Sequence, residues 1–207
     1  MKVIKMISRF NSNELDKLAE LLKEDKVISV PTDTVYGVCA RMNSEKAEQM
    51  LREVKNRPAT KAFPVMCKDI EEIEKIAYIS DKARKIIEAF MPGPITVVLK
   101  KKENIPAYVN SGMDTLAIRM ATSKEIEKII ELVGSPLFMT SANQSGEKTC
   151  TSLDEIEIAC PLISGMLIGD TKFGESSTIV DASSNEIKVL RQGPITIEQI
   201  NKVLAGE

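Results

Sequence analysis

The chain has 207 residues, of which 43% are hydrophobic and 28% charged, a composition typical of globular proteins rather than fibrous or disordered ones. It contains no histidine, which excludes histidine-dependent nucleophiles, histidine zinc sites and imidazole proton shuttles. The formal net charge is -2, so no overall positive field draws the chain to nucleic acid or to an anionic membrane.

The cysteines and the amino-terminal residues bear on the cellular compartment of the protein. The four cysteines form no CxxC pair and, without histidine, cannot complete the usual zinc sites. We therefore expect buried, inert thiols at Cys39, Cys67, Cys150 and Cys160. The opening residues lack the continuous apolar run of a secretion signal, and no stretch of about 18 apolar residues could cross a bilayer. These features predict a reduced, cytoplasmic setting without a membrane segment.

The first predicted elements are a helix and a strand. Asn11 and Glu14, three residues apart, predict a capping box for a helix that runs to about Asp25. The apolar residues 27–30 predict a strand, which Pro31 is expected to end.

A second predicted helix positions two basic residues. Ser44 is a candidate N-cap, and apolar residues follow it at helical spacing. Pro58 disfavours helical geometry at Arg57, so Lys55 and Arg57 are expected at the exit of this helix.

The rest of the chain alternates further strands and helices with no repeat or flexible linker. Strands are predicted over residues 63–66, 95–99, 115–120, 136–140, 177–182 and 187–191, and helices over residues 80–90, 123–133, 153–159 and 196–204. This alternation predicts an α/β fold, with residues 1–207 as a single domain around a twisted, mostly mixed open sheet with flanking helices. Ligand-binding loops are expected at strand ends.

The candidate binding groups are dispersed along the chain. No glycine-rich phosphate motif is present, and the nearest Walker-like string, residues 169–176, has Glu175 where lysine is required. Cations are instead predicted at element ends, at Lys55, Arg57, Lys61, Arg119 and Arg191. Loops rich in hydroxyl and amide groups occur at residues 32–34, 141–146 and 176–178.

Each of these features alone is typical of a solvated charge, a polar turn, a helix cap or an edge strand. If the loops converge, however, their hydroxyl, amide and guanidinium groups form an anion pocket. Such a pocket suits a ligand that carries several phosphates together with a small zwitterion.

Seven short motifs occur in a fixed order along the chain, and their combination is far more specific than any one of them. They are PTDTVYG (31–37), KNRPATK (55–61), PGPITVVL (92–99), LAIRM (116–120), TSANQSG (140–146), SSTIVD (176–181) and LRQG (190–193). This series resembles the YrdC/TsaC family of L-threonylcarbamoyl-AMP synthases. Because the chain stops soon after the last string, it is similar to the short single-domain form, without the extra carboxyl-terminal domain of longer relatives.

The resemblance implies a YrdC-like fold with a concave, positively lined cavity, and a nucleotidyltransferase reaction. L-threonine, bicarbonate or CO2, and ATP would give threonylcarbamoyl-AMP and pyrophosphate, with Mg2+ accompanying ATP. Other proteins would then transfer the threonylcarbamoyl group to tRNA beside the anticodon, and weak tRNA contact by this chain is compatible with that role.

The resemblance also implies roles for individual residues. The implied catalytic set is Lys55, Arg57, Ser141 and Asn143. The implied ATP-binding set is Lys55, Arg57, Lys61, Thr115, Asn143, Thr151 and Arg191. The implied L-threonine-binding set is Thr34, Arg119, Ser141 and Ser177.

Some positions depart from the family pattern. Asn56 stands where glycine is frequent, and Met66 stands where longer relatives often carry a histidine near the amino acid. No metal ligand is assigned, and loop carboxylates such as Asp33 and Asp181 more often cap or turn the chain.

Two alternatives to the synthase stay open at this stage. One is a YrdC-like paralogue that binds nucleotide without this activity, although the SAN and STI strings are intact. The other is a module that binds double-stranded RNA or tRNA, which the net charge of -2 and the few aromatic residues favour less.

Overall fold

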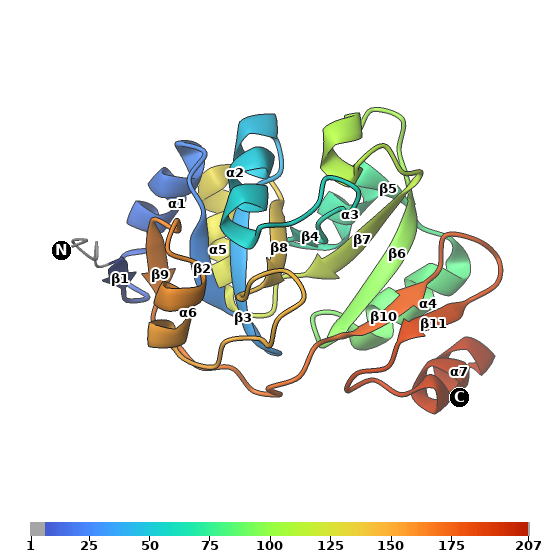
Figure 1. Ribbon diagram of the computed structural model, residues 1–207. Helices are drawn as coiled ribbons and strands as arrows, with labels where there is room; N and C mark the ends of the chain where they lie inside the picture. The colour runs from blue at the N-terminus through green and yellow to red at the C-terminus, as the bar shows by residue number, and fades with distance from the viewer. Residues whose placement is uncertain (1–6, 207) are drawn as a thin grey trace.

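The computed structural model describes residues 7–206, which form an 11-stranded mixed sheet with helices packed against it (Figure 1). The strands are β1 (Ser8–Phe10), β2 (Ile28–Pro31), β3 (Tyr36–Arg41), β4 (Val65–Cys67), β5 (Ala77–Tyr78), β6 (Ile95–Lys101), β7 (Thr115–Met120), β8 (Leu137–Ser141), β9 (Gly165–Leu167), β10 (Thr178–Asp181) and β11 (Lys188–Arg191). The helices are α1 (Leu15–Lys23), α2 (Glu45–Lys55), α3 (Ile70–Ile76), α4 (Asp81–Phe90), η1 (Ala107–Asn110), α5 (Lys124–Val133), α6 (Leu153–Ala159) and α7 (Ile197–Ala205).

The strand order confirms the mixed α/β sheet expected from the sequence. The strands lie in the order β1-β9-β2-β3-β8-β4-β7-β6-β10-β11, with β5 beside β6. Parallel pairs join β1 to β9, β2 to β9, β4 to β7 and β6 to β10, whereas the remaining neighbours are antiparallel. In Figure 1, β2 and β3 run in a clearly different direction from β6 and β7, so the sheet is strongly twisted.

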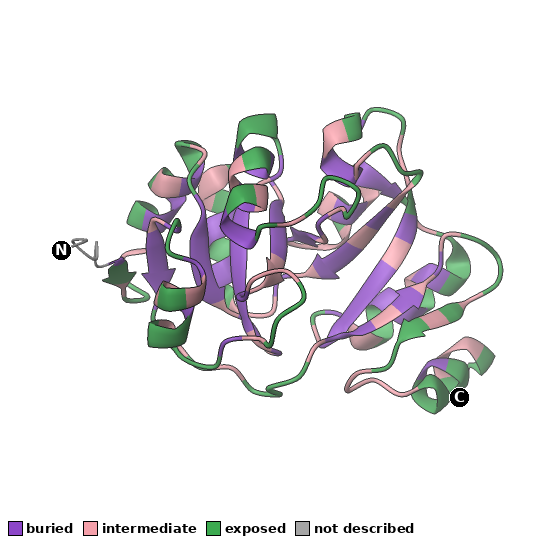
Figure 2. Cartoon of the chain, viewed as in Figure 1, coloured by how far each residue is buried: buried purple, intermediate pink, exposed green. Residues whose placement is uncertain are grey.

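Alternation along the central strands builds a core on each side of the sheet. On β8, Phe138 packs into the cluster that contains the apolar faces of α2, α3 and α4, while Leu137 and Met139 pack into the cluster beneath α1 and α5. On β4, Met66 belongs to the α1/α5 cluster and is fully buried. The central strands are accordingly buried and the outer faces of the helices exposed (Figure 2).

The amino-terminal helix differs from its prediction. The Glu14 carboxylate accepts a hydrogen bond from the Asn11 backbone amide at 3.1 Å, but no side chain caps the start of α1, so the expected capping box is only half formed. The helix ends at Lys23 rather than about Asp25, because Asp25 adopts the left-handed conformation with a φ of 62°. Pro31 is itself the last residue of β2 and pairs with Tyr36.

The structure also shows the state of the cysteines and the lengths of the helices. The four cysteines are all buried and unpaired, as expected, and burial raises the pKa of the Cys160 thiol to about 11. Among the helices of residues 7–206, none is both long and apolar enough to span a bilayer.

Candidate active site

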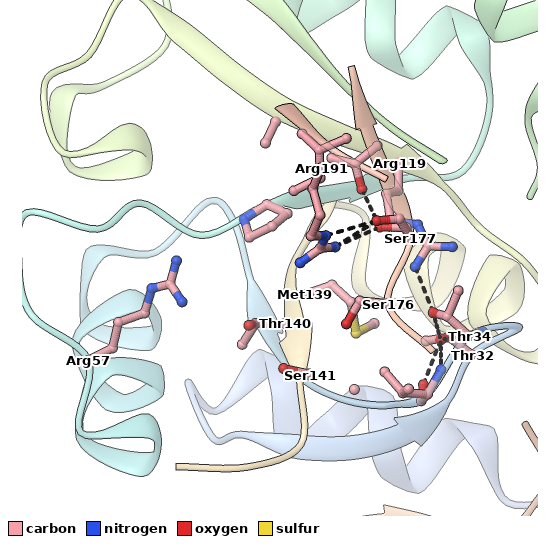
Figure 3. A pocket seen from close by; sticks show the side chains of 16 residues that line it. Thr32, Thr34, Arg57, Arg119, Met139, Thr140, Ser141, Ser176, Ser177 and Arg191 are labelled. Carbon is pink, nitrogen blue, oxygen red and sulfur yellow. Dashed lines mark hydrogen bonds between the residues drawn. The ribbon is translucent and has the colours of Figure 1, made fainter. Parts of the chain in front are cut away.

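A cavity of about 260 Å³ is lined by residues of β3, β6, β7, β8, β10 and β11 and of the adjoining loops. It is lined by six of the residues predicted to bind substrates: Thr34, Arg57, Arg119, Ser141, Ser177 and Arg191. These side chains come from β7, β11, the last residue of β8, and the loops that follow β2 and α2 or precede β10. The structure therefore brings distant segments of the chain to one recess (Figure 3).

Arg119 ties the turn after β2 to the middle of the sheet. Its guanidinium donates to Asp33 Oδ1 at 2.7 Å, to Thr34 Oγ1 at 3.2 Å and to the Gly93 carbonyl at 2.9 Å. The side chains of Arg119 and Asp33 are only 10% and 8% exposed, so this ion pair is shielded from water. The contacts fix the Thr34 hydroxyl beside a buried positive charge.

Arg191 and Ser177 form a second polar group on the same side of the cavity (Figure 3). The Arg191 guanidinium donates to the Ser177 carbonyl at 2.8 and 3.0 Å, and the Ser177 hydroxyl lies 2.8 Å from the Thr96 hydroxyl. Burial, and then the nearby Arg119 charge, lower the pKa of Arg191. The two arginines therefore already repel each other, and a bound anion would relieve that repulsion.

Arg57 lies at the opposite end of the cavity (Figure 3). The chain leaves α2 through Asn56, which adopts the left-handed conformation with a φ of 46°. The guanidinium then donates to the carbonyls of Lys61 at 3.0 Å and Ala62 at 2.6 Å, and lies 4.9 Å from the centre of the Phe63 ring. Burial, followed by the Arg52 charge, lowers the pKa of Arg57.

All of the charged side chains that line the cavity are basic. Three guanidinium groups line it, and none of its lining residues within the described part of the chain is acidic. Guanidinium forks and short hydroxyl groups bind carboxylate and phosphate oxygens well. The recess is therefore suited to an anionic ligand.

Two predicted residues lie behind the cavity wall. Lys55 and Asn143 are both buried and are absent from the lining. The Lys55 ammonium donates to the Ser141 and Asn143 carbonyls, each at 2.5 Å, and to Asn143 Oδ1 at 2.9 Å. Both residues support the loop that carries Ser141.

The remaining predicted residues lie outside this cavity. Lys61 is exposed, and its carbonyl rather than its ammonium contacts Arg57. Thr115 begins β7, at the far end of the strand from Arg119. Thr151 lines a neighbouring cavity of about 190 Å³, which shares Val35 and Ser176 with the first. Met66 is fully buried and does not reach either cavity.

Some lining residues were not singled out from the sequence. Thr96 follows the PGP turn, and its bond to the Ser177 hydroxyl depends on the parallel pairing of β6 with β10. Met139 forms part of the wall, and a Cβ atom on Gly37 would come within 2.4 Å of its sulfur. Alternation along the predicted strands could have indicated which face these residues share, but not which strands are neighbours.

The carboxylates of the described residues are dispersed rather than clustered. They contain no group of three or more cysteine, aspartate or glutamate side chains that could hold a metal ion. Asp33 is paired with Arg119, and Asp181 Oδ1 accepts hydrogen bonds from the backbone amide and hydroxyl of Ser183. Both carboxylates are thus engaged in structural contacts.

Comparisons with known proteins show which family the chain resembles. Residues 20–193 match the Sua5/YciO/YrdC family model, which is described as "Telomere recombination". A Methanocaldococcus jannaschii protein, provisionally named a threonylcarbamoyl-AMP synthase, is 38% identical over 205 residues, which are 96% of this chain and 96% of the relative. The Pyrococcus abyssi threonylcarbamoyl-AMP synthase is 33% identical over 98% of this chain, which spans 60% of that longer relative.

Solved structures extend the comparison to the fold. The crystal structure of Pyrococcus abyssi Sua5 in complex with L-threonine has a TM-score of 0.89 and 32% identity, and covers 96% of this chain and 61% of that one. Escherichia coli YciO has a TM-score of 0.83 at 20% identity, covering 94% of this chain and 100% of that one, which shows a shared fold. The family match over most of the sequence, together with these similarities, shows that the chain belongs to the Sua5/YciO/YrdC family.

Proposed function

We propose that this chain is an L-threonylcarbamoyladenylate synthase. It would convert L-threonine, bicarbonate or CO2, and ATP into threonylcarbamoyl-AMP and pyrophosphate, which makes it a nucleotidyltransferase. The observation that carries the proposal is one cavity lined by Arg57, Arg119 and Arg191, with no acidic residue in its lining within residues 7–206. The synthase names of relatives and the L-threonine bound by Pyrococcus abyssi Sua5 support it over a nucleotide-binding or RNA-binding paralogue.

The two ends of the cavity would hold different parts of the reactants. We assign the threonine carboxylate to the end with Arg119, Thr34 and Ser177, where donors are fixed by contacts inside the protein. We assign the triphosphate to the end with Arg57, whose guanidinium is anchored by two carbonyl groups. The neighbouring cavity lined by Thr151 would then extend the site for the rest of the nucleotide.

The chemistry needs no nucleophile from the protein. The neutral amine of threonine adds to CO2 and loses a proton, which gives a carbamate. A carbamate oxygen then attacks the α-phosphorus of ATP, and the bond to pyrophosphate breaks with its electron pair on the leaving group. In phosphoryl and nucleotidyl transfer of this kind, the protein contributes positioning and neutralisation of charge. The three arginines supply that charge.

The proposed reaction also requires Mg2+ and proteins that use its product. Mg2+ would enter as the complex with ATP, as part of the substrate, because the described carboxylates offer no cluster for a resident ion. The labile product would pass to proteins that transfer the threonylcarbamoyl group to tRNA. We further propose that the chain works in the cytoplasm.

Pyrophosphate release from purified protein tests the proposal. We expect release with ATP, threonine and bicarbonate together, and near-background release when either threonine or bicarbonate is omitted. Release that ignores both omissions would indicate a general ATPase instead. A steep loss of tRNA affinity with added salt, in the absence of synthesis, would favour the RNA-binding alternative.

A further inference from the structure

Lys55 occupies an unusual position for a residue expected to bind phosphate. It is the last residue of α2, and 1% of its surface is exposed. It ranks among the largest side chains of the structure that are fully buried. A buried lysine is rare unless its charge is matched by hydrogen-bond acceptors.

All of the hydrogen-bonding capacity of this ammonium is used inside the protein. An ammonium has three N–H donors, and Lys55 has three acceptors: the carbonyls of Ser141 and Asn143 and the side-chain oxygen of Asn143, at 2.5, 2.5 and 2.9 Å. No donor remains for a phosphate oxygen while these bonds persist.

The loop that Lys55 holds is closed by further bonds. The Ser141 hydroxyl donates to Asn143 Oδ1 at 2.6 Å, and the Asn143 amide nitrogen donates to the carbonyls of Gln144 at 2.8 Å and Glu147 at 2.7 Å. Asn143 is therefore saturated by the same network, and the hydroxyl of Ser141, which lines the cavity, is oriented by it.

The loop is also attached to the end of α2 at two other points. The Ser145 amide donates to the Lys55 carbonyl at 3.0 Å, and the Gln144 side chain donates to the Val54 carbonyl at 3.1 Å. Arg57 leaves the same helix end two residues later and lines the cavity. The loop over residues 141–147 and the exit of α2 thus form one connected unit that presents both Ser141 and Arg57.

We propose that Lys55 is a positioning residue, which fixes this unit so that Ser141 and Arg57 face the substrates, and that it is not a ligand of the nucleotide phosphates. The inference rests on the proposed function for the identity of the ligands. It assigns to Lys55 a different role from the one that the family resemblance implies.

The charge state of Lys55 is compatible with this role. Burial lowers the pKa of Lys55 to about 8, with a smaller lowering by Arg57, while the buried thiols of Cys160 and Cys150 raise it. The ammonium form, with three donors, therefore still predominates at neutral pH.

Nucleotide binding measured by calorimetry distinguishes the two roles. AMP, ADP and ATP are titrated into the wild type, Lys55→Met, Arg57→Met and the double variant Lys55→Met/Arg57→Met. Because a positioning residue acts on the phosphates through Arg57, this role predicts that adding Lys55→Met to Arg57→Met weakens ATP binding by less than about threefold more than it weakens AMP binding. It also predicts a fall in kcat of about 100-fold, the size expected when a preorganised donor is misplaced.

A phosphate ligand would give a different pattern. Lys55→Met would then add its own loss, growing with each phosphate and reaching about tenfold or more between AMP and ATP, even where Arg57 has already been replaced. That additional loss in the double variant, or a wild-type kcat in Lys55→Met, would overturn the proposal.

Two further measurements separate positioning from general structural damage. Gln144→Met removes another link between the loop and α2, and we expect it to lower kcat as Lys55→Met does, whereas unchanged kinetics would contradict the connected unit. In Lys55→Ala, added methylammonium or ethylammonium should restore part of kcat, because it replaces the missing donor. Absence of rescue in a folded Lys55→Ala would count against the role.

The proposed function and this inference fail in distinguishable ways. If the wild type binds nucleotides but releases pyrophosphate without needing threonine and bicarbonate, the synthase assignment fails while the nucleotide series still decides the role of Lys55. If the wild type binds none of the three nucleotides, both are overturned.

Discussion

The Arg57 side chain is preorganised to bind a ligand in the cavity. Its guanidinium is held by the carbonyls of Lys61 and Ala62 and lies over the Phe63 ring, so little freedom remains to be lost when a ligand binds. Burial lowers its pKa, which means that the charge is only partly solvated. A partly desolvated, fixed cation interacts strongly with an oxyanion.

We therefore expect a large loss of activity in Arg57→Ala. The loss of one preorganised donor costs about 3 to 4 kcal/mol, roughly 100- to 1000-fold in kcat/KM for pyrophosphate release. Arg57→Lys should also lose most activity, because an ammonium cannot reproduce the fork or the stacking on Phe63. Synthesis at the wild-type rate by a folded Arg57→Ala protein would contradict the assignment of Arg57 to the phosphates.

The ion pair between Arg119 and Asp33 makes a separate prediction about stability. Asp33→Asn keeps the shape of the side chain but leaves the buried Arg119 charge unpaired, which should reduce the free energy of unfolding by about 3 to 5 kcal/mol. Urea denaturation measures this change. Asp154→Asn is the matched control, because its pair with Arg9 is exposed and should contribute far less to the free energy of unfolding. Equal losses in the two variants would show that burial does not govern the strength of the pair.

Lys55 gives stability a defined dependence on pH. Below about pH 8 the folded and unfolded chains both bind the lysine proton, and the cost of burying the charge is fully present. Between about 8 and the ordinary value of 10.5, the folded chain has released this proton while the unfolded chain still binds it. The free energy of unfolding of the wild type should therefore rise with pH across this window relative to Lys55→Met. A constant difference between the two proteins in urea denaturation would contradict the lowered pKa.

At the scale of elements, the exit of α2 is the feature on which the site depends most. Asn56 ends this helix in the left-handed conformation, with a φ of 46°, and thereby turns Arg57 toward the cavity. The family resemblance had marked this position as one where glycine is frequent. The backbone explains that preference, because glycine and asparagine tolerate the left-handed region better than other residues.

Substitutions at Asn56 should reflect this geometry. Asn56→Gly should change the free energy of unfolding by less than about 1 kcal/mol, whereas Asn56→Val should lose about 1 to 2 kcal/mol and displace Arg57. Urea denaturation and pyrophosphate release, measured on the two variants together, check both effects. Equal behaviour of the glycine and valine variants would show that the conformation of residue 56 is not what places Arg57.

The elements also show what local sequence signals could and could not predict. The predicted cap at Ser44 is confirmed, because its side chain accepts a backbone hydrogen bond at the start of α2. Ser80 and Ser123, where two further helices were predicted to begin, cap α4 and α5 in the same way. Helix α3, which was not predicted, has a local signal of the same kind, since the Asp69 side chain accepts a hydrogen bond from the Glu72 amide three residues later.

Other elements had no comparable local signal. Strand β3 is almost entirely buried, so it lacks the polar alternation that marks a half-exposed strand. Strands β1 and β9 have three residues each and gain their order from pairing with each other and with β2. Such pairing joins distant parts of the chain and therefore cannot be predicted from a local sequence pattern.

At the scale of the whole molecule, the twist of the sheet converts dispersed motifs into one site. Arg57 and Arg191 are separated by most of the chain, yet both line the same cavity. The family motifs could indicate that the loops meet, but Lys55 appears in them only as a cation. Its burial behind the loop depends on tertiary packing. That residues 1–207 form a single domain stays a prediction.

The origin of the carbamoyl carbon tests the central claim most directly. Purified protein is incubated with ATP, L-threonine and 13C-labelled bicarbonate, and the product is analysed by mass spectrometry. We predict a single adenylate that contains threonine and one 13C atom, with an equal amount of pyrophosphate. Formation of ADP and phosphate, or of an adenylate without the labelled carbon, would contradict the assignment of this cavity to threonylcarbamoyl-AMP synthesis.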